Sequence, residues 1–159
     1  MNFKDQLKIS NDRNITQRDM IIASVITMVM GSFFTYLSHG KSLLVTFLPG
    51  LACAWSIYLF MFLKKISLPH TEKFTPIFLI ALAAQFLHFA EEHGTGFISF
   101  FGIHYEGAPY DDNIFTWFNM ASYAVFTLGY VFGMYYRKRF LLIPAFFFIC
   151  AGVLGNAIW

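Results

Sequence analysis

The residues best suited to chemistry lie in one short segment, Gln85 to His93, where a histidine is followed by two glutamates. In a helix, Glu91 and Glu92 come three and four residues after His88, so the three side chains share one face, with Gln85 one turn before them. A neutral imidazole and a carboxylate can exchange a proton across a hydrogen bond. A histidine and a carboxylate one turn apart also bind iron or manganese in water-soluble helical bundles. The segment therefore predicts a proton-handling site or a metal site.

The composition predicts that a membrane protein carries these residues. Of the 159 residues, 57% are hydrophobic and only 13% are charged, whereas about a quarter of the residues of a soluble domain are charged. The 21 phenylalanines are more than a soluble core of this size would hold, so we expect the Phe-rich runs to face lipid. The net charge is only +2 and no basic patch is interleaved with aromatic residues, so no nucleic-acid partner is expected.

Five runs are long and apolar enough to cross a membrane as helices. They cover residues 20–38, 43–63, 75–93, 114–136 and 140–159. The predicted fold class is all-α, a polytopic transmembrane helical bundle in which residues 20–159 form one domain behind an N-terminal tail of residues 1–19. Pro49 and Gly50 interrupt the second run and are tolerated if neighbouring helices satisfy the freed backbone groups.

The basic residues predict the orientation of the spans. The tail, the connection between the second and third spans and the connection between the fourth and fifth hold ten of the eleven Lys and Arg residues, and Lys41 is the exception. With five spans these segments share one side, which the positive-inside rule assigns to the cytoplasm. We therefore expect a multi-pass membrane protein whose N-terminus lies in the cytoplasm. The segment from Gly94 to Asn113 then lies outside, as an acidic and solvated loop.

Three of the predicted spans bring polar side chains to a similar depth. At a rise of about 1.5 Å per residue, His88 lies about 20 Å above the inner boundary of a hydrocarbon core about 30 Å thick. Asn119 lies about 8 Å below the outer boundary, and Asn156 about 24 Å above the inner one. Polar side chains in lipid face a bundle interior or a wet cavity, so we expect a shared pocket near the outer leaflet. The alternatives are that both asparagines only link helices and that Glu92 and His93 only occupy the headgroup zone.

The same residues resemble the HXXEE family of small bacterial membrane proteins, whose motif reads His88-Phe89-Ala90-Glu91-Glu92 here. The similarity extends over residues 87–97 and continues in Phe118-Asn119 and in Gly155-Asn156-Ala157-Ile158-Trp159. The resemblance implies a bacterial inner membrane as the location, but no activity, since none is established for the family. Family members continue with a His directly after the Asn-x-x-Trp segment. The resemblance therefore implies either a shortened variant or a chain that continues past Trp159. If that second His belongs to the site, its absence from this sequence argues against metal binding or catalysis.

The preferred hypothesis is a membrane-embedded enzyme that acts on a lipid or another apolar substrate. His88, Glu91 and Glu92 would act as general base and acid, or would bind a divalent metal such as iron, zinc or manganese through their mixed nitrogen and oxygen ligands. Asn119 and Asn156 would orient the substrate. The sequence does not separate a metalloenzyme from a metal-free acid/base enzyme.

Two other interpretations remain open. The protein is a small proton-coupled carrier or binding component with the His/Glu cluster as its protonation site, or it is a structural subunit whose polar residues only hold helices together. Five spans show no inverted repeat and no matched pair of broken helices, which argues against a carrier unless the chain forms a homo-oligomer. Cys53 and Cys150 lie in separate apolar runs and are expected to be packing residues without a disulfide.

Overall fold

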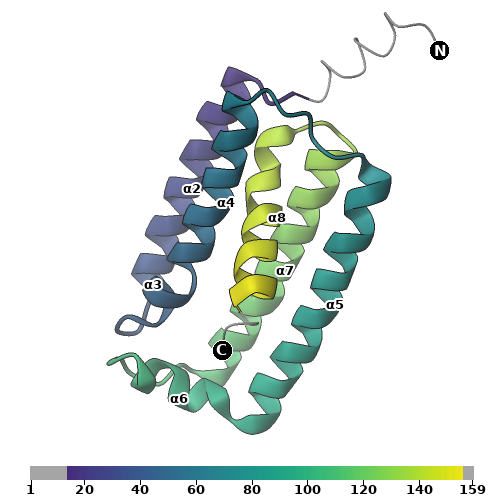
Figure 1. Cartoon of the computed structure of the whole chain (residues 1–159). Helices are drawn as coiled ribbons and strands as arrows, with labels where there is room; N and C mark the ends of the chain where they lie inside the picture. Colours follow the sequence, from purple (N-terminus) through teal and green to yellow (C-terminus); the bar gives the residue numbers. More distant parts are fainter. Residues whose placement is uncertain (1–13, 156–159) are drawn as a thin grey trace, which may run out of the picture.

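The computed structural model describes residues 14–155, and this part of the chain folds into helices without a β-strand (Figure 1). The long helices are α2 (Gln17–Leu37), α4 (Leu48–Leu63), α5 (Thr71–Thr95) and α7 (Asp112–Met134). The short ones are α3 (Ser42–Thr46), α6 (Phe97–His104), the 3₁₀ turn η1 (Arg139–Leu141), α8 (Leu142–Phe148) and the π-helical η2 (Ile149–Gly155). The prediction of an all-α fold is confirmed for the described residues.

Three stretches of helix are long and apolar enough to cross a membrane, which indicates a membrane protein. They are Gln17–Leu37, Ser42–Leu63, which joins α3 to α4, and Thr71–Thr95. The helix α7 has 23 residues, but polar residues such as Asn119 interrupt its apolar sequence. The last apolar helix, Arg139–Gly152, is shorter, and the end of the fifth predicted span, residues 156–159, lies outside the described residues.

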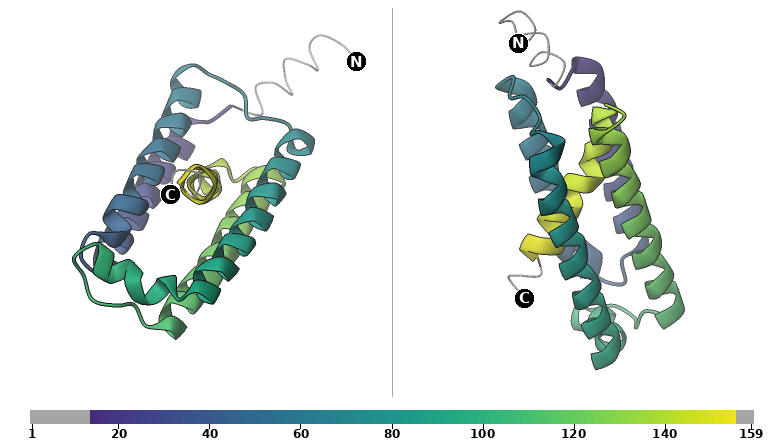
Figure 2. Two further views of the ribbon diagram at one scale, coloured as in Figure 1. Left: turned by 60° about the horizontal axis from the view of Figure 1, so that its bottom comes forward. Right: turned by 90° about the vertical axis from the view of Figure 1, so that its right-hand side faces the viewer.

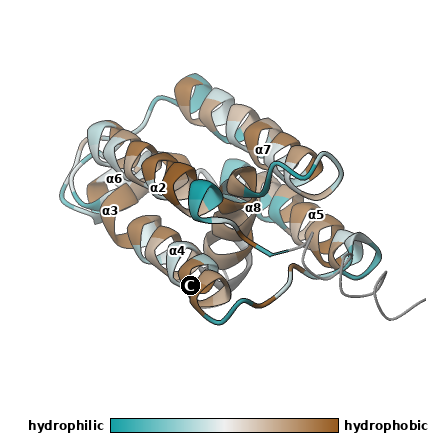
Figure 3. Cartoon of the chain, turned by 90° about the horizontal axis from the view of Figure 1, so that it is seen from above, coloured by the Kyte–Doolittle hydropathy of each residue, from teal (hydrophilic) through white to brown (hydrophobic). Residues whose placement is uncertain are grey.

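The outward face of α2 is apolar, which indicates whether lipid or water surrounds the folded chain. Ile21, Val25 and Met28 follow one another at helical spacing and are 58%, 49% and 62% exposed. Figure 3 shows hydrophobic residues along the helices and hydrophilic residues mainly in the connecting segments. An apolar stripe of this size is unfavourable against water and favourable against lipid.

The helix α8 runs through the middle of the bundle, between the α2/α4 pair and the α5/α7 pair (Figures 1 and 2). It packs against α2, α4 and α7, and all of its residues from Leu142 to Phe148 are buried. A helix surrounded by other helices needs apolar side chains all round, and this sequence supplies them. The expectation that Phe-rich runs face lipid is therefore wrong for Phe146, Phe147 and Phe148, which form part of the core.

Local sequence signals explain where the main helices begin and end. Thr16 and Asp19 form a capping box, in which each side chain accepts a hydrogen bond from the backbone N–H of the other, and α2 starts there. The carboxylate of Asp111 accepts the backbone N–H of Ile114 at 2.9 Å and caps α7. Gly96 ends α5 with a φ of 71°, which glycine adopts without the strain of a side chain.

The segment predicted as a solvated outer loop contains the helix α6, which lies across one end of the bundle (Figure 1). Its residues Ile98, Phe101 and Gly102 are buried. The loop prediction is wrong for this stretch because an apolar run of eight residues is too short to cross a membrane but long enough to cover the end of a helical bundle.

The two cysteines, expected to be packing residues of separate helices without a disulfide, approach each other. Their thiols lie within hydrogen-bonding reach of each other, and both are free. Gly50, one turn before Cys53, allows α4 and η2 to approach each other. A Cβ atom on Gly50 would clash with the Cβ atom of Ala151, because the two would lie only 2.8 Å apart.

Candidate functional site

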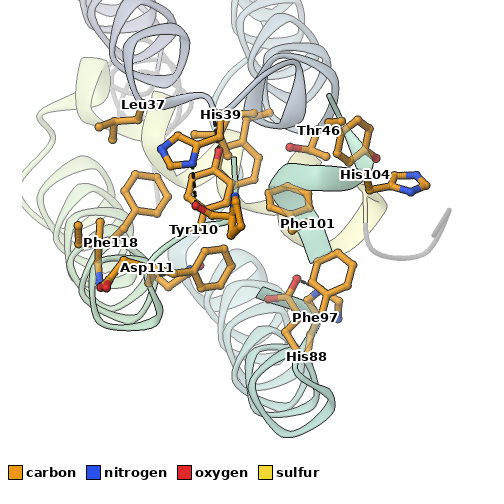
Figure 4. A pocket seen from close by; sticks show the side chains of 18 of the residues that line it. Leu37, His39, Thr46, His88, Phe97, Phe101, His104, Tyr110, Asp111 and Phe118 are labelled. Carbon is orange, nitrogen blue, oxygen red and sulfur yellow. Dashed lines mark hydrogen bonds and ion pairs between the residues drawn. The ribbon is translucent and has the colours of Figure 1, made fainter. Parts of the chain in front are cut away.

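A cavity of about 740 Å³ lies at the end of the bundle that α6 crosses. Residues of α2, α3, α5, α6, α7 and η2 and of the connections around them line it, and Figure 4 shows the side chains of most of these residues. Much of the lining is aromatic, contributed by Phe47, Phe97, Phe101, Phe115 and Phe118. A largely apolar cavity of this volume, with a few polar groups, is typical of small-molecule sites.

The predicted His/Glu cluster forms one polar wall of this cavity. The Nε2 atom of His88 lies 3.2 Å from Oε1 of Glu92, within hydrogen-bonding reach. The Nδ1 atom of the same ring lies 3.9 Å from Oε2 of Glu91, close enough for an ion pair but long for a hydrogen bond. The imidazole therefore stands between two carboxylates, one facing each ring nitrogen.

The three side chains differ in their access to the surroundings. The side chain of Glu91 is 72% exposed, that of His88 is 31% exposed and that of Glu92 is 16% exposed. The row thus runs from an open carboxylate at the rim, through the imidazole, to a largely buried carboxylate. A proton can follow such a row because imidazole accepts a proton on one nitrogen and releases one from the other.

The same geometry bears on the predicted metal ligands. One metal ion cannot bind both nitrogens of one imidazole ring, and here each nitrogen faces a different carboxylate. Among the described residues, no group of three His, Cys, Asp or Glu side chains is arranged to hold a metal ion. The binding of one metal ion by His88, Glu91 and Glu92 together stays a prediction.

Asn119 lines the same cavity, as predicted from its depth. Its Nδ2 atom donates a hydrogen bond to the carbonyl of Phe115 at 3.0 Å, and its Oδ1 atom accepts a long one from the Tyr123 hydroxyl at 3.4 Å. Both partners belong to α7, so these two bonds do not link α7 to another helix. Gln85 lines the cavity too, whereas Asn156 lies outside the described residues.

Sequence analysis missed a second polar group of the cavity, formed by His39 and Tyr110. Their rings stack with centroids 4.2 Å apart and planes at 5°. The Tyr110 hydroxyl accepts the backbone N–H of His39 at 2.9 Å and lies 2.6 Å from Oγ of the buried Ser42. His39 Nδ1 lies 3.1 Å from the carbonyl oxygen of Ala108, a position in which this nitrogen donates. The only signal in the sequence was the presence of polar residues in two short connections between predicted helices.

These contacts join two connections that we call the outer latch, residues 38–41 between α2 and α3 and residues 105–111 between α6 and α7. Lys41 contributes twice, since its backbone N–H donates to the carbonyl of Tyr105 at 2.9 Å and its Nζ atom lies 2.6 Å from Oε2 of Glu106. The outer latch holds α6 across the end of the bundle and thereby closes one side of the cavity.

Comparison of the chain with family models, with curated proteins and with solved structures finds no match. The resemblance to the HXXEE proteins therefore rests on the residues of the motif and its surroundings.

Proposed function

We propose that the protein crosses a bacterial inner membrane five times, with its N-terminus in the cytoplasm. Three helices of sufficient length and apolar character support a membrane location. The remaining two spans would be α7 and the C-terminal helix that begins at η1. The basic residues at the ends of α4 and α7 lie on the same side as the start of α2 (Figure 1), in agreement with the positive-inside rule. The cavity then opens toward the outer leaflet.

We call Glu91, His88 and Glu92 together the His88 row. Within this protein, the cavity binds a small molecule with an apolar body, and the His88 row moves a proton to or from the polar end of that molecule. The observation that carries this proposal is the imidazole held between an exposed and a buried carboxylate on the wall of an aromatic cavity. General acid–base catalysis requires such a group within hydrogen-bonding reach of the reacting atom and shielded from bulk water. Glu92 would hold or accept the inner proton, and Glu91 would exchange the outer one with water. Asn119 lies on the same lining and would contact the substrate.

The test compares lipid extracts from cells that express the parent protein, His88→Gln or His93→Gln. His93 lies on the same helix and is exposed, but it does not line the cavity, so its variant controls for expression and for the change of side chain. We expect mass spectrometry to find a lipid-soluble species altered by the parent and by His93→Gln but not by His88→Gln.

The outcomes separate the candidate functions. An equal change of the lipid extract in all three strains would contradict an acid/base role of His88. A molecule that copurifies with the parent without any conversion would instead favour the proton-coupled carrier or binding component. A metal found in stoichiometric amount in the parent and lost in His88→Gln would favour the metalloenzyme.

A further inference from the structure

Apart from histidines, the charged residues that line the cavity are all acidic. They are Glu91, Glu92 and Asp111, and no Lys or Arg belongs to the described lining. Lys41 stands nearby in the outer latch but is paired with Glu106 at 2.6 Å. Carboxylates in a cavity with apolar walls produce a negative potential that attracts cations and repels anions.

The three carboxylates are not equally free to meet a ligand. Asp111 already accepts the backbone N–H of Ile114 at 2.9 Å, and the positive end of α7 offsets part of its charge. Glu92 faces Nε2 of His88 on one side and the cavity on the other. Glu91 contacts His88 only at 3.9 Å and is mostly exposed. The wall formed by α5 therefore supplies most of the negative charge that a ligand would meet.

Aromatic rings line the same cavity as this charged wall. The ring of Phe101 lies at the centre of a cluster, with its centroid 5.3 Å from that of Phe97, 5.5 Å from that of Tyr105 and 5.7 Å from that of Tyr110. All four residues line the cavity. The faces of aromatic rings attract organic cations, and quaternary ammonium groups are recognised in cages of this composition.

We propose that the ligand of this cavity is an amphiphile with an ammonium head group and an alkyl or aromatic body. The ammonium lies beside Glu91 and Glu92 among the rings, and the body packs against the phenylalanine lining. A fatty acid or another anionic amphiphile would place its negative charge beside two carboxylates. The inference rests on the proposed function and names its substrate class, since an amine that carries a proton is a natural partner for the His88 row.

The experiment measures the binding of three single-chain probes to the full chain in a non-ionic detergent. The probes are decyltrimethylammonium, decylphosphocholine and decanoate, which share a ten-carbon chain and differ in the charge of the head group. Each is titrated below its micelle concentration, and the dissociation constant is obtained by isothermal titration calorimetry. We expect decyltrimethylammonium to bind at least about tenfold more tightly than decanoate, as a cation–π contact combined with a nearby carboxylate predicts.

Matched variants locate the binding. Glu92→Gln removes one charge at the cavity, whereas Glu72→Gln removes one at the opposite end of α5, where the side chain is exposed. The first is expected to weaken binding of the cation about tenfold, and the second to leave it unchanged. If Glu92→Gln does not fold, the exposed Glu91 allows the same comparison through Glu91→Gln.

Each outcome decides between the proposals. Binding of decyltrimethylammonium alone supports a ligand whose head group carries only the ammonium charge, and equal binding of decylphosphocholine supports the ammonium of a zwitterionic lipid. Binding of decanoate as tight as that of the cation would overturn the ammonium proposal but would leave the proposed acid/base function standing. Absence of binding by all three probes to folded protein would overturn the ammonium proposal, and the proposed acid/base function would then be decided by the comparison of lipid extracts.

Discussion

Glu91 and Glu92 are neighbours in the sequence but meet His88 in different surroundings. The Glu91 contact is long and its side chain is mostly exposed, and exposed ion pairs typically contribute less than about 1 kcal/mol to stability. The Glu92 contact is shorter and largely shielded from water, so it controls the orientation of the imidazole ring. Water around Glu91 leaves it free to exchange protons. The two adjacent carboxylates thus have separate roles in the proposed row.

Tyr110 connects the two halves of the outer latch through its hydroxyl group. Replacing it by phenylalanine removes the acceptor of the His39 backbone N–H and a partner of the buried Ser42 hydroxyl. We expect Tyr110→Phe to lower the free energy of unfolding by about 1–2 kcal/mol, because the part-buried backbone N–H of His39 is left without its acceptor. Thermal unfolding in detergent measures this loss. Tyr36→Phe, at a side chain that is 85% exposed, is the matched control, and an equal loss there would contradict the role of the outer latch.

At the scale of elements, α6 depends on close backbone packing. A Cβ atom on Gly102 would lie 1.9 Å from the carbonyl oxygen of Ala108, in the outer latch. Backbone atoms cannot withdraw as the end of a flexible side chain can. A substitution at Gly102 therefore has to move α6 or the connection that follows it.

Two glycine-to-alanine substitutions test this dependence. We expect Gly102→Ala to destabilise the protein by about 1–3 kcal/mol or more, as overpacking does. Gly94→Ala on α5 should be neutral or stabilising by up to about 1 kcal/mol, because nothing lies within 4 Å of its added Cβ atom and alanine favours helix over glycine. Unfolding midpoints of the two purified variants provide the comparison. A Gly102→Ala variant as stable as Gly94→Ala would mean that α6 is not held as described.

For the whole molecule, the proposed topology makes an accessibility prediction. In a background in which Cys53 and Cys150 are replaced by serine, Asp112→Cys and Lys64→Cys each place one thiol at an exposed position near opposite ends of the bundle. A membrane-impermeant maleimide added to intact cells is expected to label Asp112→Cys and to label Lys64→Cys only after the membrane is opened, because the positive-inside rule places Lys64 in the cytoplasm. Labelling in the reverse order would invert the topology and place the cavity at the inner leaflet.

The sequence by itself determined the all-helical fold class and the helices that carry the candidate site. Apolar runs of about 20 residues predict membrane-crossing helices whatever their neighbours are. Helical spacing alone puts His88, Glu91 and Glu92 on one face of α5, and Asn119, which the sequence places in another helix, lines the same cavity. These features are local, or depend only on the rise per residue of a helix.

Only the tertiary structure decided the features that depend on contacts between distant segments. The stacking of His39 on Tyr110, the approach of Cys53 to Cys150 and the burial of Phe146 to Phe148 all join residues far apart in the chain. The orientation of α5 about its own axis also decides that the side chain of Glu92 is largely buried whereas that of Glu91 is mostly exposed. Hydrophobicity is nearly uniform around a membrane helix, so the sequence does not reveal which face meets a neighbouring helix and which meets lipid. That choice depends on how the helices pack, and it determines which polar side chains share the cavity.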